Sequence, residues 1–189
     1  GDQPTGAPPI NGESSEGGDE SQGNSGSCTP VKLMQTALSP NVVLVLDKSG
    51  SMVADPSGLW DHDDDPMTPA VTRWSSLHEV VETVVTDFDA KINFGAHLYP
   101  SDAATSSYSE EACLVDGDIN IGVAAANKDA ILGGIPEASD VSLRGGTPVS
   151  IAMNIALDHL KTLDPEVPRA ILLVTDGAAN CALGSESAE

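Results

Sequence analysis

Two short apolar runs constrain the fold of this chain more than any other feature. They occupy residues 42–46 (VVLVL) and 170–174 (AILLV). A strand with one face in water alternates apolar and polar residues, whereas a strand of a parallel sheet is apolar throughout because helices cover both of its faces. The two runs therefore predict buried strands of a parallel sheet.

Two amphipathic helices are predicted between these strands. Residues 76–90 carry apolar side chains at the i, i+3, i+4, i+7 spacing of a helix, and Ser76 with Glu79 can form a capping box. Residues 147–163 form the second helix, in which Pro148 suits the first position. Its inner side is marked by Ile151, Ile155 and Leu160.

The remaining predicted elements are shorter. They are strands over residues 91–99 and 169–175, a hairpin-like piece over 112–123, and a helix over 127–132 that Gly133 and Gly134 end. Strands that alternate with helices are typical of an open α/β sheet with right-handed crossovers. We therefore expect a Rossmann-like, open, mostly parallel sheet flanked by helices.

Polar residues gather where the predicted strands end. Asp47, Ser49 and Ser51 follow the first apolar run, Asp176 follows the second, and Thr147 opens a helix after two glycines. Ligands of open α/β sheets bind beyond the carboxyl ends of the strands. Carboxylate and hydroxyl oxygens suit a hard cation such as Mg²⁺. If the two strands are neighbours, these side chains form one metal site.

Each piece also has a simpler interpretation. Asp47 and Ser49 can stabilise a turn or cap a helix. Thr147 before Pro148 is a good helix cap, and Asp176 before Gly177 is a common turn dipeptide. The metal hypothesis therefore depends on finding the three pieces together.

In this order the pieces resemble the metal-ion-dependent adhesion site (MIDAS) of the von Willebrand factor type A (VWA) family, whose signature is Asp-x-Ser-x-Ser, then a distant Thr and a distant Asp. The resemblance spans residues 40–181, and Thr72-Arg73-Trp74 looks like bacterial members. It implies that Ser49 and Ser51 bind Mg²⁺, or Mn²⁺ or Ca²⁺, directly. Thr147 would join when a ligand is bound, and Asp47 and Asp176 would act partly through water.

The resemblance also implies a function. The ion would coordinate an Asp or Glu of a protein partner, so that the chain is a cation-dependent binding module of the adhesion type. The alternative is the VWA subunit of a metal-chelatase or AAA-type assembly. The family fold usually has six strands, so we expect the last strands to be missing and residues 169–175 to form an exposed apolar edge.

Charge and tail composition limit the partners and the domain boundaries. With 29 acidic and 8 basic residues the net charge is −21, which repels nucleic acid and anionic lipid. Residues 1–30 are rich in Gly, Ser and acidic residues and predict a flexible linker, which leaves residues 31–189 as the VWA domain. No stretch predicts a transmembrane helix. A lipid anchor upstream of residue 1 would suit such a tether.

Three cysteines bear on the compartment. Cys113 and Cys181 follow predicted core segments and are compatible with a disulfide, although reduced cysteines are the alternative. The partner of Cys28 is undetermined. With the linker, a disulfide favours an extracytoplasmic location: the cell surface, the outer membrane or the periplasm.

Enzyme motifs do not match. The glycine-rich pieces lack the lysine and spacing of a phosphate-binding loop, and residues 48–50 do not form a nucleophile elbow. The histidines are scattered without metal-ligand spacing: His62, His78, His97 and His159. We therefore predict no catalytic residues and no enzyme activity.

An acidic loop offers a second metal hypothesis. Asp61, Asp63 and Asp65 have the opening spacing of an EF-hand loop, but Pro66 replaces the required glycine and Thr72 replaces the bidentate glutamate. A solvated acidic loop is the better interpretation.

Overall fold

The computed structural model describes residues 38–53, 65, 67, 71–106, 109–177 and 179–181. The predicted linker, Cys28, and Asp61 and Asp63 of the acidic loop lie outside the described residues. The strands are β1 (Asn41–Asp47), β2 (Asn93–Tyr99), β3 (Ile121–Ala124) and β4 (Arg169–Val174). The α-helices are α1 (Arg73–Phe88), α2 (Lys128–Gly134) and α3 (Val149–Lys161). The 3-10 helices are η1 (Gly50–Met52) and η2 (Glu110–Cys113).

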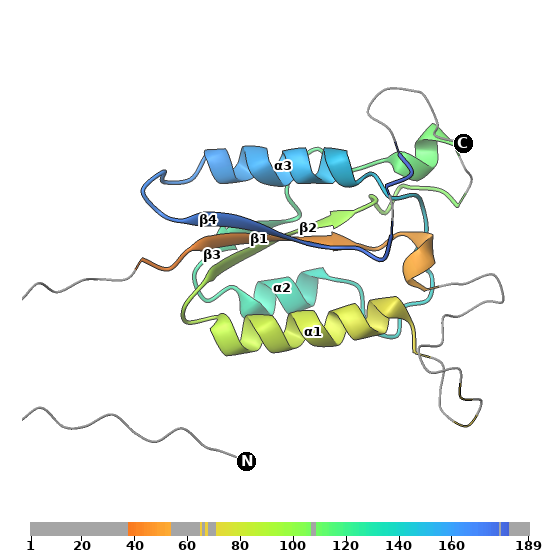
Figure 1. The fold of residues 1–189 in the computed structure, drawn as a ribbon, viewed down its shortest axis with the longest axis horizontal. Helices are drawn as coiled ribbons and strands as arrows, with labels where there is room; N and C mark the ends of the chain where they lie inside the picture. The colour runs from red at the N-terminus through yellow and green to blue at the C-terminus, as the bar shows by residue number, and fades with distance from the viewer. Residues whose placement is uncertain are drawn as a thin grey trace, which may run out of the picture. The chain divides into compact units, whose positions relative to one another are not determined.

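The strands form one sheet in the order β3-β2-β1-β4. β1 lies in the middle and runs parallel to both β2 and β4, whereas β3 runs antiparallel to β2. Helices α1 and α2 cover one face of the sheet and α3 covers the other (Figure 1). The predicted fold class, an open, mostly parallel α/β sheet flanked by helices, is confirmed. The carboxyl ends of β1, β2 and β4 therefore meet at one edge.

The core has two layers because successive side chains of a strand point to opposite faces. Leu44 and Leu46 of β1 pack with α1 and α2 residues such as Leu77, Val81 and Ile131. Val43 and Val45 pack beneath α3, against Ala152, Ala156 and Leu160. Both faces of β1 are buried, which is why its sequence shows no polar alternation.

The helix ends differ from the sequence-based expectation. α1 begins at Arg73, and the Thr72 side chain caps it by accepting a hydrogen bond from Ser75 N at 3.0 Å. The predicted capping box of Ser76 and Glu79 is therefore wrong, because Ser76 already lies inside the first turn. α2 continues through both of the glycines that were expected to end it.

The start of α3 is also shifted. The helix begins at Val149, and Pro148 occupies the position just before it rather than the first helical position. The cap position is thus taken by Pro148, which makes no side-chain cap hydrogen bond, and Thr147 lies one residue before it.

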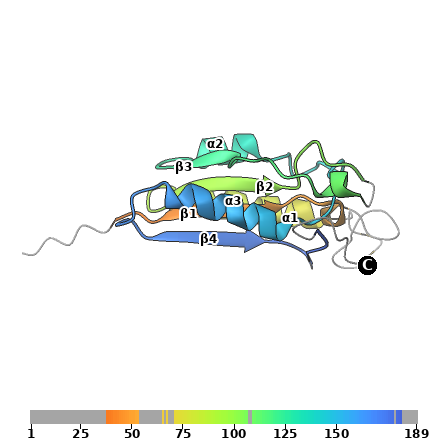
Figure 2. The same ribbon diagram turned by 90° about the horizontal axis from the view of Figure 1, so that it is seen from above.

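β4 forms an edge of the described sheet, paired on one side with β1 (Figure 2). Its Leu172 is 46% exposed. Within the described residues the sheet thus has an apolar edge strand, as expected for residues 169–175 if the last strands of the family fold are missing. No helix of the described part of the chain is long and apolar enough to cross a membrane.

His97 is a buried titratable group in this core. It is fully buried in β2, and neither of its ring nitrogens has a hydrogen-bond partner within the described residues. Burial lowers the pKa of His97 below its ordinary value, and nearby Asn120 and Asp116 offset part of this effect. The folded protein therefore holds His97 neutral at pH 7.

We expect stability to fall below about pH 6.5 because of His97. The unfolded chain then binds a proton that the folded chain resists, so the free energy of unfolding decreases by about 1.4 kcal/mol per pH unit between the two pKa values. Above pH 6.5 this contribution is fully retained. Urea denaturation at pH 7.5, 6.5 and 5.5 checks the slope. His97→Leu should flatten the curve in this range; an unchanged slope would contradict the assignment to His97.

Candidate metal centre

Asp47 ends β1 and is completely buried. One carboxylate oxygen, Oδ1, accepts a hydrogen bond from Ser49 N at 2.8 Å, and the other, Oδ2, accepts one from Thr175 Oγ1 at 2.7 Å. Burial raises the pKa of Asp47, against these hydrogen bonds, and the charge of Asp176 raises it further. Through these two hydrogen bonds Asp47 links the turn after β1 to the segment after β4.

The two serines of this turn lie next to Asp176. The hydroxyls of Ser49 and Ser51 are 3.1 Å apart, and Ser51 Oγ donates to Asp176 Oδ1 at 3.1 Å. The turn places both hydroxyls on one side because the chain passes directly from extended Ser49 into η1. Three of the five predicted metal ligands are therefore connected in one hydrogen-bonded chain, across 125 residues of sequence.

The loop that leads to Thr147 contacts the serine turn through the backbone of Gly145. Gly50 N, in the serine turn, donates to Gly145 O at 3.1 Å, and Thr147 N donates to Asn180 Oδ1 at 2.6 Å. Gly145 has a φ of +103°, and a Cβ there would lie 2.6 Å from Pro100 Cγ. Only glycine suits that backbone and that space, so Gly145 allows the Thr147 loop to lie against the serine turn.

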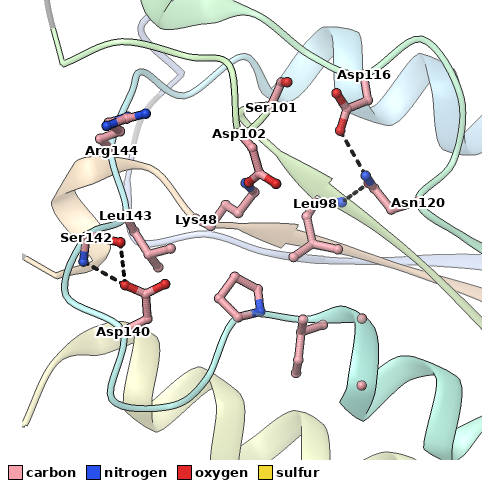
Figure 3. Close-up of a pocket in the computed structure, with 14 residues that line it drawn as sticks. Lys48, Leu98, Ser101, Asp102, Asp116, Asn120, Asp140, Ser142, Leu143 and Arg144 are labelled. Carbon is pink, nitrogen blue, oxygen red and sulfur yellow. Dashed lines mark hydrogen bonds and ion pairs between the residues drawn. The ribbon is translucent and has the colours of Figure 1, made fainter.

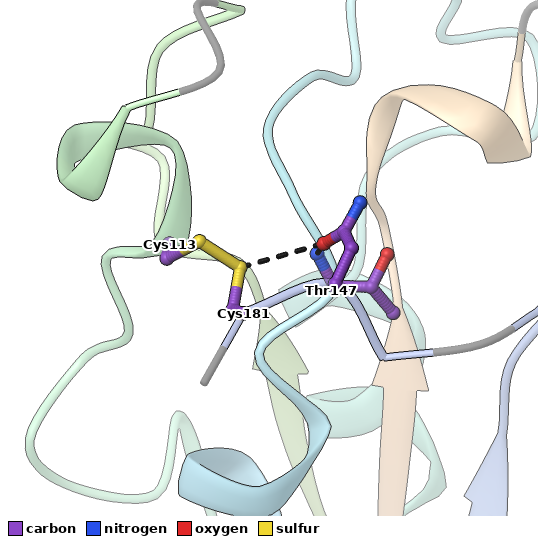
Figure 4. The surroundings of a disulfide bond; sticks show 4 residues. Cys113, Thr147 and Cys181 are labelled. Carbon is purple, nitrogen blue, oxygen red and sulfur yellow. Dashed lines mark hydrogen bonds between the residues drawn. A yellow bond between two sulfur atoms is a disulfide. The ribbon is translucent and has the colours of Figure 1, made fainter. Parts of the chain in front are cut away.

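A disulfide joins Cys113 to Cys181 beside this loop (Figure 4), as the cysteine positions allowed. A Cβ on Gly146 would lie 2.8 Å from Cys181 Sγ and 3.0 Å from Asn180 Oδ1. Gly146 therefore lets the disulfide and Asn180 pack directly against the backbone that leads to Thr147.

Three residues of the site had no role in the sequence-based hypothesis. Thr175 holds Asp47, Asn180 holds the backbone of Thr147, and Arg73 Nη1 donates to Asp176 Oδ2 at 2.7 Å and to Ser51 O at 3.0 Å. Thr175 could have been found, because it continues the alternation of Ile171 and Leu173, which face α3. No periodic signal marks Arg73 or Asn180.

The five predicted ligands offer side-chain oxygen atoms only. Within the described residues no group of three or more His, Cys, Asp or Glu could hold a metal ion, and the candidate set has two carboxylates, Asp47 and Asp176, with hydroxyls for the rest. Oxygen donors fit Mg²⁺, Mn²⁺ or Ca²⁺ rather than softer metals. These residues therefore suit a hard divalent cation that is coordinated largely by hydroxyl oxygens.

A polar pocket of about 510 Å³ adjoins the serine turn (Figure 3). Lys48, which stands between Asp47 and Ser49, extends into this pocket and forms an ion pair with Asp102. Asp116, Asp140 and Arg144 also line it. The positive charge of Lys48 therefore lies in the pocket, where Asp102 pairs with it.

A mostly parallel sheet with helices on both faces, and with these loops at its carboxyl edge, defines an α/β protein with a fold like that of a VWA domain. Solved structures with a similar fold support this description of the fold. The chain is similar to the pilus adhesin SpaC from Lactobacillus rhamnosus GG (TM-score 0.52, 19% identity, 77% of this chain and 16% of that one). It is equally similar to the PilB minor pilin from Streptococcus sanguinis (TM-score 0.52, 19% identity, 77% of this chain and 31% of that one).

These similarities concern the fold, since both identities are low. The chain spans less than a third of the length of either protein. No protein-family model matches the sequence, and no curated protein matches it.

Proposed function

We propose that this chain is a divalent-cation-dependent, protein-binding module of the adhesion type, with residues 31–189 as the VWA domain and residues 1–30 as its linker. The observation that carries the proposal is the hydrogen-bonded chain Ser49-Ser51-Asp176 at the carboxyl edge of the sheet, with buried Asp47 beneath it. The structural similarity to a pilus adhesin supports it.

In this proposal each residue has a defined role. Ser49 and Ser51 bind Mg²⁺, or Mn²⁺ or Ca²⁺, directly, and Thr147 joins when a partner is bound. Asp47 and Asp176 act partly through water. Because most direct ligands are neutral hydroxyls, the ion keeps an affinity for a further anion, and it supplies an electrophile for an Asp or Glu side chain of a protein partner.

The disulfide supports an extracytoplasmic location, on the cell surface or in the envelope, because such bonds persist in oxidising compartments. It also argues against the alternative, a cytoplasmic chelatase or AAA-type assembly subunit. A lipid anchor upstream remains compatible with this location. The net charge of −21 disfavours nucleic acid as the partner.

The test is a cation-dependent melting curve. Saturating Mg²⁺ or Mn²⁺, at about 100 times the dissociation constant, should raise the melting temperature by about 5–10 °C relative to chelator. Ser51→Ala should remove most of the increase, since Ser51 links the turn to Asp176. Asp47→Ala should remove all of it.

Ser142→Ala is the matched control, because Ser142 also donates to an aspartate, Asp140, at 2.7 Å but on a different exposed loop. Its cation response should equal that of the wild type. The binding step is checked with an immobilised Asp-containing peptide, which should capture the wild type in Mg²⁺ and not in chelator. A wild-type melting curve unchanged by saturating cation would end the proposal.

A further inference from the structure

Arg73 lies where the proposed cation would act. Its guanidinium donates to the carboxylate of Asp176 at 2.7 Å and to the backbone carbonyl of Ser51 at 3.0 Å. The Asp176 side chain is only 8% exposed and the Arg73 side chain 35%. The guanidinium thus contacts two of the three loops that make up the candidate metal centre.

This position is not explained by the helix that carries Arg73. The residue is the first of α1, and the amino end of a helix carries a partial positive charge that disfavours cations. Placing an arginine there costs free energy unless a carboxylate offsets it. Asp176 is one such carboxylate, at 2.7 Å, so its contact with the candidate centre helps to stabilise the arrangement.

The net charge of the candidate centre is small. Asp47 and Asp176 contribute two negative charges, and Arg73 returns one positive charge, since a guanidinium remains protonated in proteins. Lys48 is turned away and paired with Asp102. A divalent ion entering the centre must therefore compete with one guanidinium for Asp176.

We propose that Arg73 is a built-in counter-ion that competes with the divalent cation at Asp176 and so lowers the cation affinity of the site. This inference rests on the proposed function. It assigns to Arg73 the role of setting the cation concentration at which the module becomes able to bind an acidic partner. Without cation the guanidinium neutralises Asp176, and with cation the ion pair is weakened.

The experiment is calorimetric titration of the full chain with Mn²⁺ and Mg²⁺. Arg73→Gln keeps a hydrogen-bond donor near Ser51 O but removes the charge, and it should bind the cation roughly tenfold more tightly than the wild type. Arg73→Lys keeps the charge and should stay within about twofold. Lys161→Gln is the control for net charge, since Lys161 pairs with Asp158 on the surface of α3, and its affinity should not change.

The outcomes separate the two proposals. If the wild type binds the cation and Arg73→Gln binds it equally or more weakly, Arg73 has only a structural role and this inference fails while the proposed function stands. If neither binds any cation, both fail. Arg73→Met is the second variant; tighter binding by both neutral variants, together with an unchanged Lys161→Gln, supports competition.

Discussion

Replacing both Cys113 and Cys181 by serine is expected to lower the free energy of unfolding by about 4 kcal/mol. The disulfide closes a loop with a sequence separation of 68 residues, and its removal returns that much conformational freedom to the unfolded chain. Urea denaturation in chelator measures the loss without a contribution from bound cation.

The same variant should bind cation more weakly. Cys181 follows Asn180, whose side chain holds the backbone of Thr147 at 2.6 Å, so loss of the bond frees the segment that positions one proposed ligand. Reducing the wild type with dithiothreitol should reproduce both effects. A double variant that loses less than about 1 kcal/mol would show that packing alone holds this segment.

Trp74→Ala is expected to destabilise the protein by about 3–5 kcal/mol, the range for truncating a buried aromatic side chain. Trp74 is fully buried in α1, and its Nε1 donates to Glu137 O at 3.0 Å. It therefore joins the start of α1 to the segment that leads from α2 toward Thr147. Thermal and urea denaturation of the full chain measure the effect.

Trp74→Phe separates packing from the hydrogen bond. Phenylalanine keeps most of the buried ring and loses the bond to Glu137, so its cost should be well under half that of alanine. Equal losses for the two variants would mean that the hydrogen bond, rather than burial, is what Trp74 contributes.

The sheet and its helices were predictable because burial leaves a periodic record in the sequence. The run over residues 42–46 lacks alternation, and β1 is indeed covered on both faces. The sequence places the start of α1 too late, at residue 76, because the apolar period that predicts the helix starts at Leu77. Trp74, one step earlier on the same buried face, belongs to the pattern, and Thr72 rather than Ser76 caps the helix.

The candidate centre was predictable to a smaller extent. Parallel neighbouring strands bring their carboxyl ends to one edge, so the approach of Ser51 to Asp176 followed from topology. The contacts of Arg73 and Asn180 depend on the paths of irregular loops, which carry no period. The role of Thr175 was available from strand alternation, and the direct binding of a cation stays a prediction.

Within the part of the chain that the structure describes, β4 is paired on one side only, and this has a mechanical consequence for the candidate centre. The strand leads within two residues to Asp176, and Thr175 holds the carboxylate of Asp47. An extended segment that pairs with this edge, from this chain or another, would make β4 and the residues that follow it, including Asp176, more rigid. Edge occupancy and ion binding would then be thermodynamically linked, each strengthening the other, although no atom is shared between the two places.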